Sequence, residues 1–116
     1  MPQYSVIKFY ADTVRDEPVN IGVVLYDQKQ NYIKFKFLND LFKKMSVKDI
    51  EIHKQYLDMF ISSYYKINSI EEICKLIERK LSPYASSGII FTEPRGTLAE
   101  DPEKEIEELY DRFVEI

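Results

Sequence analysis

YSVIKFY at residues 4–10 and VNIGVVLY at residues 19–26 are the stretches of sequence that decide the fold. Both are rich in β-branched and aromatic residues, and a short polar segment separates them, so they predict two antiparallel strands. A third run, NYIKFKFL at residues 31–38, alternates apolar and polar positions, which is typical of a half-buried strand. Because residues 27–30 have hairpin length, the three strands are expected to form a meander.

Helical spacing replaces the strand pattern after these three runs. Apolar residues between positions 41 and 45 suggest a short helix, and an apolar stripe at three- and four-residue steps predicts a long helix over residues 49–66. Ser69 begins a capping-box pattern, which predicts a second helix that ends before Pro83. These two helices are expected to pair as a hairpin.

The C-terminal part combines a short strand, a turn and a last helix. GIIFT at residues 88–92 is too short and too β-branched for a helix, so it predicts a fourth strand. Residues 93–96 have turn composition, with Pro94 and Gly96 as structural residues. Asp101, followed by a proline and acidic residues, predicts a capped helix start.

These patterns predict one α+β domain over residues 1–116. Its core is a small, mainly antiparallel sheet of about four strands, the first three a meander, covered on one face by three or four helices. A chain of 116 residues can bury a core without disulfides or a structural metal. No repeat or low-complexity tract marks a domain boundary.

Composition excludes several classes of function. The chain has 16 Lys and Arg against 20 Asp and Glu, and this net charge of −4 argues against a globally basic nucleic-acid binder. One Cys and one His cannot build a zinc site, and 3 glycines cannot build a glycine-rich phosphate loop, so neither metal nor cofactor is expected. Without a secretory signal or a long apolar run, the protein is expected to be cytoplasmic and not membrane-bound.

Charge is unevenly distributed along the chain. Residues 93–116 carry nine acids and three bases, whereas lysines gather between residues 29 and 48. The acids are typical of a solvated helix face, with an acidic docking surface as the alternative. The lysines are typical of a protected exposed strand, with stacking of a nucleic-acid base on Tyr32 as the alternative.

The densest cluster of varied polar residues lies between the first two strands. A structural interpretation has Arg15 paired with Glu17, Asn20 bound to a backbone group, and Gly22 permitting a bulge or a tight backbone contact. A functional interpretation has Arg15 binding an anion, Glu17 orienting it or acting as a base, and Asn20 donating to a ligand. The spacing alone identifies no reaction.

The direction of the fourth strand decides whether Arg95 joins this cluster. If the helical connection is a right-handed crossover, strand four runs parallel to strand one, and Arg15 and Arg95 share one rim. With Asn20, this rim would suit a phosphate or a carboxylate. If strand four instead pairs antiparallel with an edge strand of the meander, the two loops lie at opposite ends and the composite site is lost.

Two isolated side chains are weaker catalytic candidates. His53 lies on the apolar stripe of the long helix and lacks a paired nucleophile, so it is expected to be a core or boundary residue. Cys74 is expected on the buried face of the second helix between Ile73 and Ile77, where a thiol acts as a small hydrophobe.

Several of these motifs together resemble the bacterial domain-of-unknown-function 3037 family. The resemblance is carried by YSVI at residues 4–7, by Arg15, Glu17 and VNIGVVL within residues 14–25, and by the motifs at residues 93–96 and 101–103. It spans nearly the whole chain. The family is uncharacterised, so the resemblance implies no catalytic residue. It does imply genes beside HipA-like kinase proteins, and hence a kinase of this type as partner of an accessory protein.

The leading hypothesis is a non-enzymatic, cytoplasmic accessory module that binds another protein. It would use the loop from Arg15 to Gly22, the turn at Arg95 and the acidic C-terminal helix. One alternative is a small anion- or nucleotide-binding protein, or an enzyme, that uses Arg15, Glu17, Asn20 and Arg95. A further alternative is an acidic inhibitor that imitates nucleic acid, as some phage-encoded proteins do.

Overall fold

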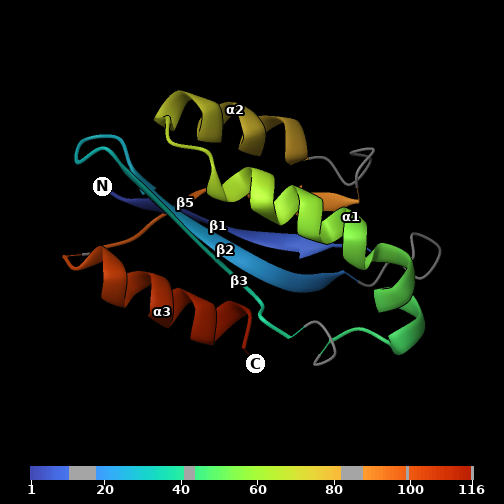
Figure 1. Ribbon diagram of the computed structural model, residues 1–116. Coiled ribbons are helices and arrows are strands. Elements are labelled where there is room, and N and C mark those ends of the chain that lie inside the picture. Colours follow the sequence, from blue (N-terminus) through green and yellow to red (C-terminus); the bar gives the residue numbers. More distant parts are fainter. Residues whose placement is uncertain (11–17, 41–43, 82–87, 99, 116) are drawn as a thin grey trace.

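The computed structural model describes residues 1–10, 18–40, 44–81, 88–98 and 100–115. These residues form a twisted antiparallel sheet with helices on either side (Figure 1). The strands are β1 (Gln3–Phe9), β2 (Val19–Asp27), β3 (Tyr32–Phe37), β4 (Ile89–Phe91) and β5 (Arg95–Gly96), and the helices are α1 (Val47–Tyr65), α2 (Ile70–Lys80) and α3 (Pro102–Phe113). The predicted α+β class is therefore confirmed.

The sheet has the order β3-β2-β1-β4, and β5 also pairs with β1. All of these pairings are antiparallel, so the predicted meander of the first three strands is confirmed. β4 pairs with the end of β1, where Ile89 lies opposite Phe9. β5 pairs with the start of β1, where Arg95 lies opposite Tyr4. The residues expected to form only a turn thus include a short strand.

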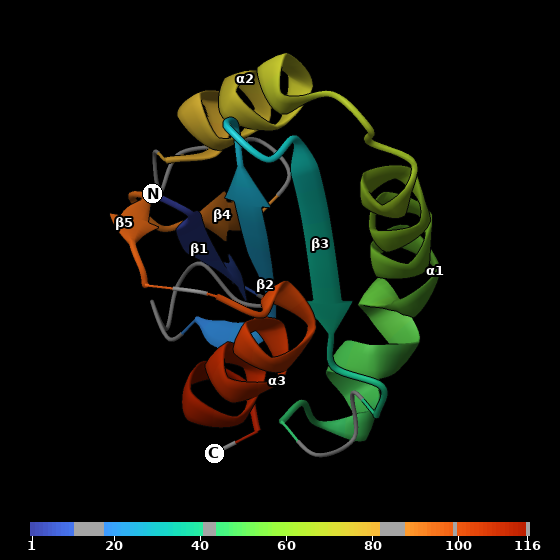
Figure 2. The ribbon, with the colours of Figure 1, turned by 90° about the vertical axis from the view of Figure 1, so that its left-hand side faces the viewer.

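Helices cover both faces of the sheet, and the expectation of one covered face is wrong (Figure 2). α1 and α2 share one apolar cluster with Val24 of β2, whereas α3 shares a second cluster with Val23 and Leu25. Neighbouring residues of a strand point to opposite faces, so β2 contributes to both clusters. The uninterrupted burial from Ile21 to Asp27 is typical of a strand covered on both sides.

Opposite charges accompany the packing of α3 against β3. Lys34 forms an ion pair with Glu103, and Lys36 forms one with Glu107. The Lys36 ammonium also lies 4.5 Å from the ring centroid of Tyr110. Exposed ion pairs contribute at most about 1 kcal/mol each, so the apolar cluster holds the helix and the ion pairs select its orientation.

Side-chain caps begin the three helices near the predicted positions. The hydroxyls of Ser46 and Ser69 accept from backbone N–H groups of α1 and α2, and the Asp101 carboxylate accepts from those of Glu103 and Lys104. Each cap satisfies donors that have no partner inside the helix. The short helix predicted between residues 41 and 45 falls largely outside the described residues.

Three buried tyrosines make the fold sensitive to alkaline pH. Burial, the largest cause in each case, raises the pKa of Tyr26, Tyr64 and Tyr110 from 10.0 to about 12. In addition, the hydroxyl of Tyr64 is buried without a hydrogen-bond partner among the described residues. The unfolded chain loses these protons near pH 10, whereas the folded chain keeps them to about pH 12.

The free energy of unfolding is therefore expected to fall as pH rises from about 10 towards about 12, because the unfolded state then binds fewer protons. Urea unfolding followed by circular dichroism at about pH 9 and about pH 11 would measure this fall as a lower midpoint. Tyr64→Phe removes one of the ionising groups, so its midpoint should fall less. Equal midpoints for the unchanged protein at both pH values would contradict the prediction.

Candidate functional site

A small hollow lies over β1 on the side of the sheet that carries α3. α3 packs chiefly against β2 and β3, which leaves the opposite half of this face with little helix above it. The hollow has a volume of about 160 Å³. It is lined by Tyr4, Val6, Lys8, Asn20, Thr92, Arg95 and Phe113. We call it the β1 hollow.

Strand geometry brings two cationic side chains to the β1 hollow. Tyr4, Val6 and Lys8 alternate along β1 and so face the same side of the sheet. A register shift between Ile7 and Lys8 places Lys8 opposite Asn20, whereas Arg95 lies opposite Tyr4. Lys8 and Arg95 therefore stand roughly 13 Å apart along the sheet, so their long side chains can reach a group held between them.

The two cations of the β1 hollow have no acidic partner in the described part of the chain. Lys8 is half-buried and Arg95 is exposed, and neither forms an ion pair with any of the described carboxylates. Lys34 and Lys36 differ, because acids of α3 neutralise both. Guanidinium and ammonium groups without a partner attract carboxylates and phosphates, so the hollow is suited to an anionic group.

Asn20 fastens the end of α3 beside the β1 hollow. Its side-chain Nδ2 donates to the backbone carbonyl of Phe113 at 2.7 Å. The Phe113 ring stacks on Tyr4 with a centroid distance of 5.7 Å, and both rings line the hollow. Asn20 therefore positions one wall, in line with the structural interpretation of an amide bound to a backbone group.

Thr92 holds the opposite side of the β1 hollow in place. Its hydroxyl accepts from the backbone N–H of Val6 at 2.8 Å, and its carbonyl accepts from the Ser5 hydroxyl at 2.6 Å. These bonds attach the segment between β4 and β5 to β1. The sequence patterns do not point to Thr92 or Lys8 as site residues. One signal for Lys8 is present, because it is the charged residue within the predicted strand YSVIKFY.

Arg15 and Glu17 lie outside the described residues. The strand pairing nevertheless excludes the alternative with a parallel fourth strand, because β4 is antiparallel to β1. Tyr10 and Pro18, which flank residues 11–17, adjoin the Phe9 end of β1, whereas Arg95 adjoins its start. After β3 the chain runs along α1 away from the Phe9 end of β1 and returns to that end along α2 (Figure 1). β4 therefore starts beside Phe9 and runs antiparallel to β1.

The predicted structural residues occupy distinct places. A Cβ on Gly22 would lie 2.5 Å from the Phe37 ring, so the close approach of that ring requires glycine. Gly96 is the last residue of β5 and lies opposite Gln3 of β1. It follows directly after Pro94 and Arg95 in the chain. Asp101 caps α3 through hydrogen bonds of 3.1 and 3.4 Å to backbone N–H groups.

His53 and Cys74 differ in how they match expectation. The His53 ring packs edge-on against Phe9 at a centroid distance of 5.2 Å, which agrees with a boundary role. Cys74, by contrast, is exposed, and its expected burial is wrong. α2 buries Ile73, Leu76 and Ile77, and a helix turns about 100° per residue, so Cys74 falls beside that stripe.

Other kinds of site are not found in the described part of the chain. It contains no group of three or more His, Cys, Asp or Glu side chains placed to hold a metal ion. Nor is any of its helices both long enough and apolar enough to cross a membrane.

One protein family matches the part of the chain that forms the sheet and the β1 hollow. The profile of one family, described as a protein of unknown function (DUF3037), matches residues 4–114. The chain belongs to this family. The match includes every residue that lines the β1 hollow of this DUF3037 protein. No curated protein and no solved structure matches the DUF3037 protein significantly.

Proposed function

We propose that this protein is a non-enzymatic, cytoplasmic accessory module that binds an acidic group of a partner protein in the β1 hollow. The observation that carries the proposal is the pair of cations Lys8 and Arg95, which line one hollow and form no ion pair with the described residues. Asn20 and Thr92 support it, because each holds a wall of the hollow through hydrogen bonds. Because these walls are already held in place, binding does not have to order them, and this lowers the entropic cost of binding.

The size of the β1 hollow favours a side chain over a nucleotide. Ligand pockets commonly enclose roughly 300–1,000 Å³. The hollow has a volume of about 160 Å³, which suits one carboxylate or phosphate group. This favours a protein partner over the alternative of a nucleotide-binding protein or enzyme.

The alternative of an acidic inhibitor that imitates nucleic acid receives less support. Imitation requires acids that remain available at phosphate-like spacing. Glu103 and Glu107 of α3 already pair with Lys34 and Lys36 of β3. The acidic helix is thus partly neutralised within the chain.

A HipA-like kinase is the first partner to test, because the resemblance to the DUF3037 family implies genes beside HipA-like kinase proteins; the chain belongs to this family. The cytoplasmic location rests on the single cysteine, since one thiol cannot form an internal disulfide. Arg15 and Glu17, which lie outside the described residues, remain candidate contacts for the same partner. Single alanine variants at these two positions belong in the same experiment.

The test is capture of partners by the tagged protein from its native host, with identification by mass spectrometry. The double variant Lys8→Ala/Arg95→Ala should lose the partner, and the affinity of the purified pair should fall at least about tenfold. Its melting temperature should change little, because neither side chain has an ion-pair partner among the described residues.

The double variant Lys48→Ala/Arg79→Ala is the matched control. It removes the same charges from exposed positions on α1 and α2, away from the β1 hollow. It should retain the partner in full. Equal capture by both double variants would overturn the proposal, and unfolding of Lys8→Ala/Arg95→Ala alone would favour a purely structural role.

A further inference from the structure

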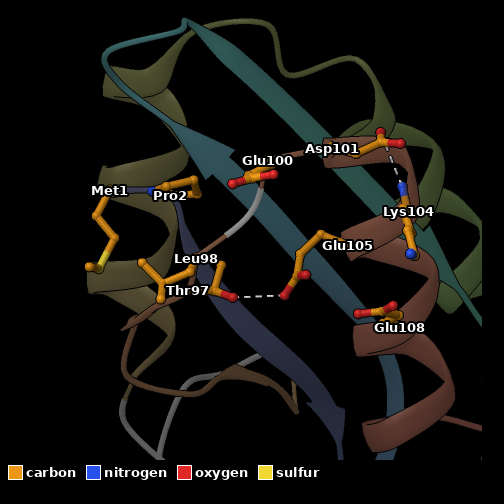
Figure 3. Close-up of a pocket in the computed structure, with 9 residues that line it drawn as sticks. All are labelled: Met1, Pro2, Thr97, Leu98, Glu100, Asp101, Lys104, Glu105 and Glu108. Atoms are coloured by element: carbon orange, nitrogen blue, oxygen red, sulfur yellow. Dashed lines mark hydrogen bonds between the residues drawn. The ribbon is translucent and has the colours of Figure 1, made fainter.

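We propose that a groove beside the first turns of α3 is a second docking surface, and that it takes a basic, partly apolar segment of a partner protein. The groove lies between the N-terminal residues, the segment after β5 and α3 (Figure 3). Its volume of about 680 Å³ is much larger than that of the β1 hollow. It is lined by Met1, Pro2, Thr97, Leu98, Glu100, Asp101, Lys104, Glu105 and Glu108. We call it the α3 groove.

The helical repeat explains how the carboxylates gather there. Positions 105 and 108 are separated by three residues, so they share one face of α3, and the N-cap residue Asp101 lines the groove at the start of the helix. Glu100 faces the same space from the preceding segment (Figure 3). The hydroxyl of Thr97 donates to Glu105 at 2.7 Å and so ties the segment after β5 to the helix. The two walls are therefore held at a defined separation.

Negative charge predominates in the lining of the α3 groove. Its lining contains four carboxylates and one lysine. Glu100 and Glu108 are exposed and form no ion pair with the described residues, in contrast to Glu103 and Glu107 on the side of α3 that faces β3. The acids of α3 thus divide into a set that pairs within the chain and a set that faces the groove.

Apolar surface lies at the edge of the α3 groove, where Leu98 is two residues before Glu100 and its side chain points away from α3 (Figure 3). The Leu98 side chain is 87% exposed, the largest exposed fraction among the large hydrophobic residues described. An apolar side chain bordered by acids matches a segment in which lysine or arginine alternates with leucine-like residues. The aliphatic stem of a lysine or arginine can also cover Leu98 while its charged end reaches Glu100. Nucleic acids and phosphorylated groups are repelled by the same carboxylates.

This surface is separate from the β1 hollow and opposite to it in charge, so it does not depend on the function proposed above. Two surfaces of opposite sign would let the module contact two different segments of one partner, or two partners. When both segments belong to one partner, the total affinity increases through linkage rather than through a larger single contact.

The probe is the blocked peptide acetyl-KLKGKLKG-amide, titrated calorimetrically into the full chain, with acetyl-ELEGELEG-amide as the charge-reversed control. The lysine peptide should bind saturably at a single site, more weakly as salt is added, and the glutamate peptide should not bind. Glu108→Gln and Leu98→Ser should each weaken binding about fivefold to tenfold, and Glu100→Gln/Glu108→Gln more.

Glu51→Gln is the matched control, because it removes the same charge from an exposed position on α1. It should leave the affinity unchanged. Equal weakening by Glu51→Gln and Glu108→Gln would reduce the effect to overall charge and overturn the proposal. Absence of saturable binding would overturn it too, as would self-association of the chain that Glu108→Gln abolishes, since the occupant would then be a second copy.

Discussion

Replacing Phe91 by alanine is expected to lower the free energy of unfolding by about 3–5 kcal/mol. Phe91 is fully buried in the middle of the larger apolar cluster, although β4 is only 3 residues long. Its ring meets Tyr64 of α1 edge-on at a centroid distance of 5.6 Å, and its backbone lies opposite Ile7 of β1. The ring thus connects the sheet to the helical layer.

Urea unfolding followed by circular dichroism at neutral pH would measure this loss. Because small domains are stable by only about 5–15 kcal/mol, the variant should unfold at a much lower urea concentration. Leu98→Ala is the matched control, since it also removes an apolar side chain, from a position that is 87% exposed. It should change stability by less than about 0.5 kcal/mol. A loss below about 1 kcal/mol for Phe91→Ala would mean that the cluster repacks around β4.

Leu109→Ala should cost about 2–5 kcal/mol and also weaken binding at both proposed surfaces. Leu109 is buried in the smaller cluster, where α3 meets Val23 and Leu25 of β2. α3 supplies Phe113 to the β1 hollow and Glu105 to the α3 groove, so a loosened helix disturbs both walls. The urea midpoint and the affinity for the lysine peptide should therefore fall together.

Leu57→Ala separates this local effect from a general loss of stability. Leu57 is fully buried, but it belongs to the larger cluster on the other side of the sheet. It should destabilise the protein to a similar extent and leave peptide binding intact at temperatures well below melting. If both variants bound the peptide equally well, α3 would not be the element that positions the α3 groove.

Local patterns predicted the elements of the fold well. The alternation of Ile33, Phe35 and Phe37 with lysines marks β3, and Ser69 and Asp101 begin their helices as expected. These signals depend only on neighbours in the chain: a strand repeats every two residues, and a cap satisfies N–H groups two or three residues ahead. They hold wherever the element lies in the molecule.

The errors concern the surroundings of each element. The helical patterns predict helices on one face of the sheet, although the unbroken apolar run from Ile21 to Tyr26 indicates a strand buried on both faces. Cys74 was assigned to the buried stripe of α2, but the stripe follows Ile73 and Ile77 and leaves the thiol exposed. Periodicity shows that a helix has an apolar face, but not which surface covers it.

The candidate site shows the same division. Their chemistry predicts Asn20 and Arg95 as site residues, and both line the β1 hollow, whereas the strand pattern around Lys8 predicts no such role for it. Arg95 reaches the hollow because the chain doubles back through β4 and β5 along β1. No local pattern encodes that path, since strand pairing depends on contacts between residues far apart in the chain.

The amino-acid sequence alone established the α+β class, the meander, the helix starts and the family, because all of these follow from short-range spacing and from motifs. The direction of β4, the position of α3 on the second face and the meeting of Lys8 with Arg95 emerge only when the chain is folded. They depend on which apolar surfaces cover one another, and that choice is made by the packing of the whole molecule.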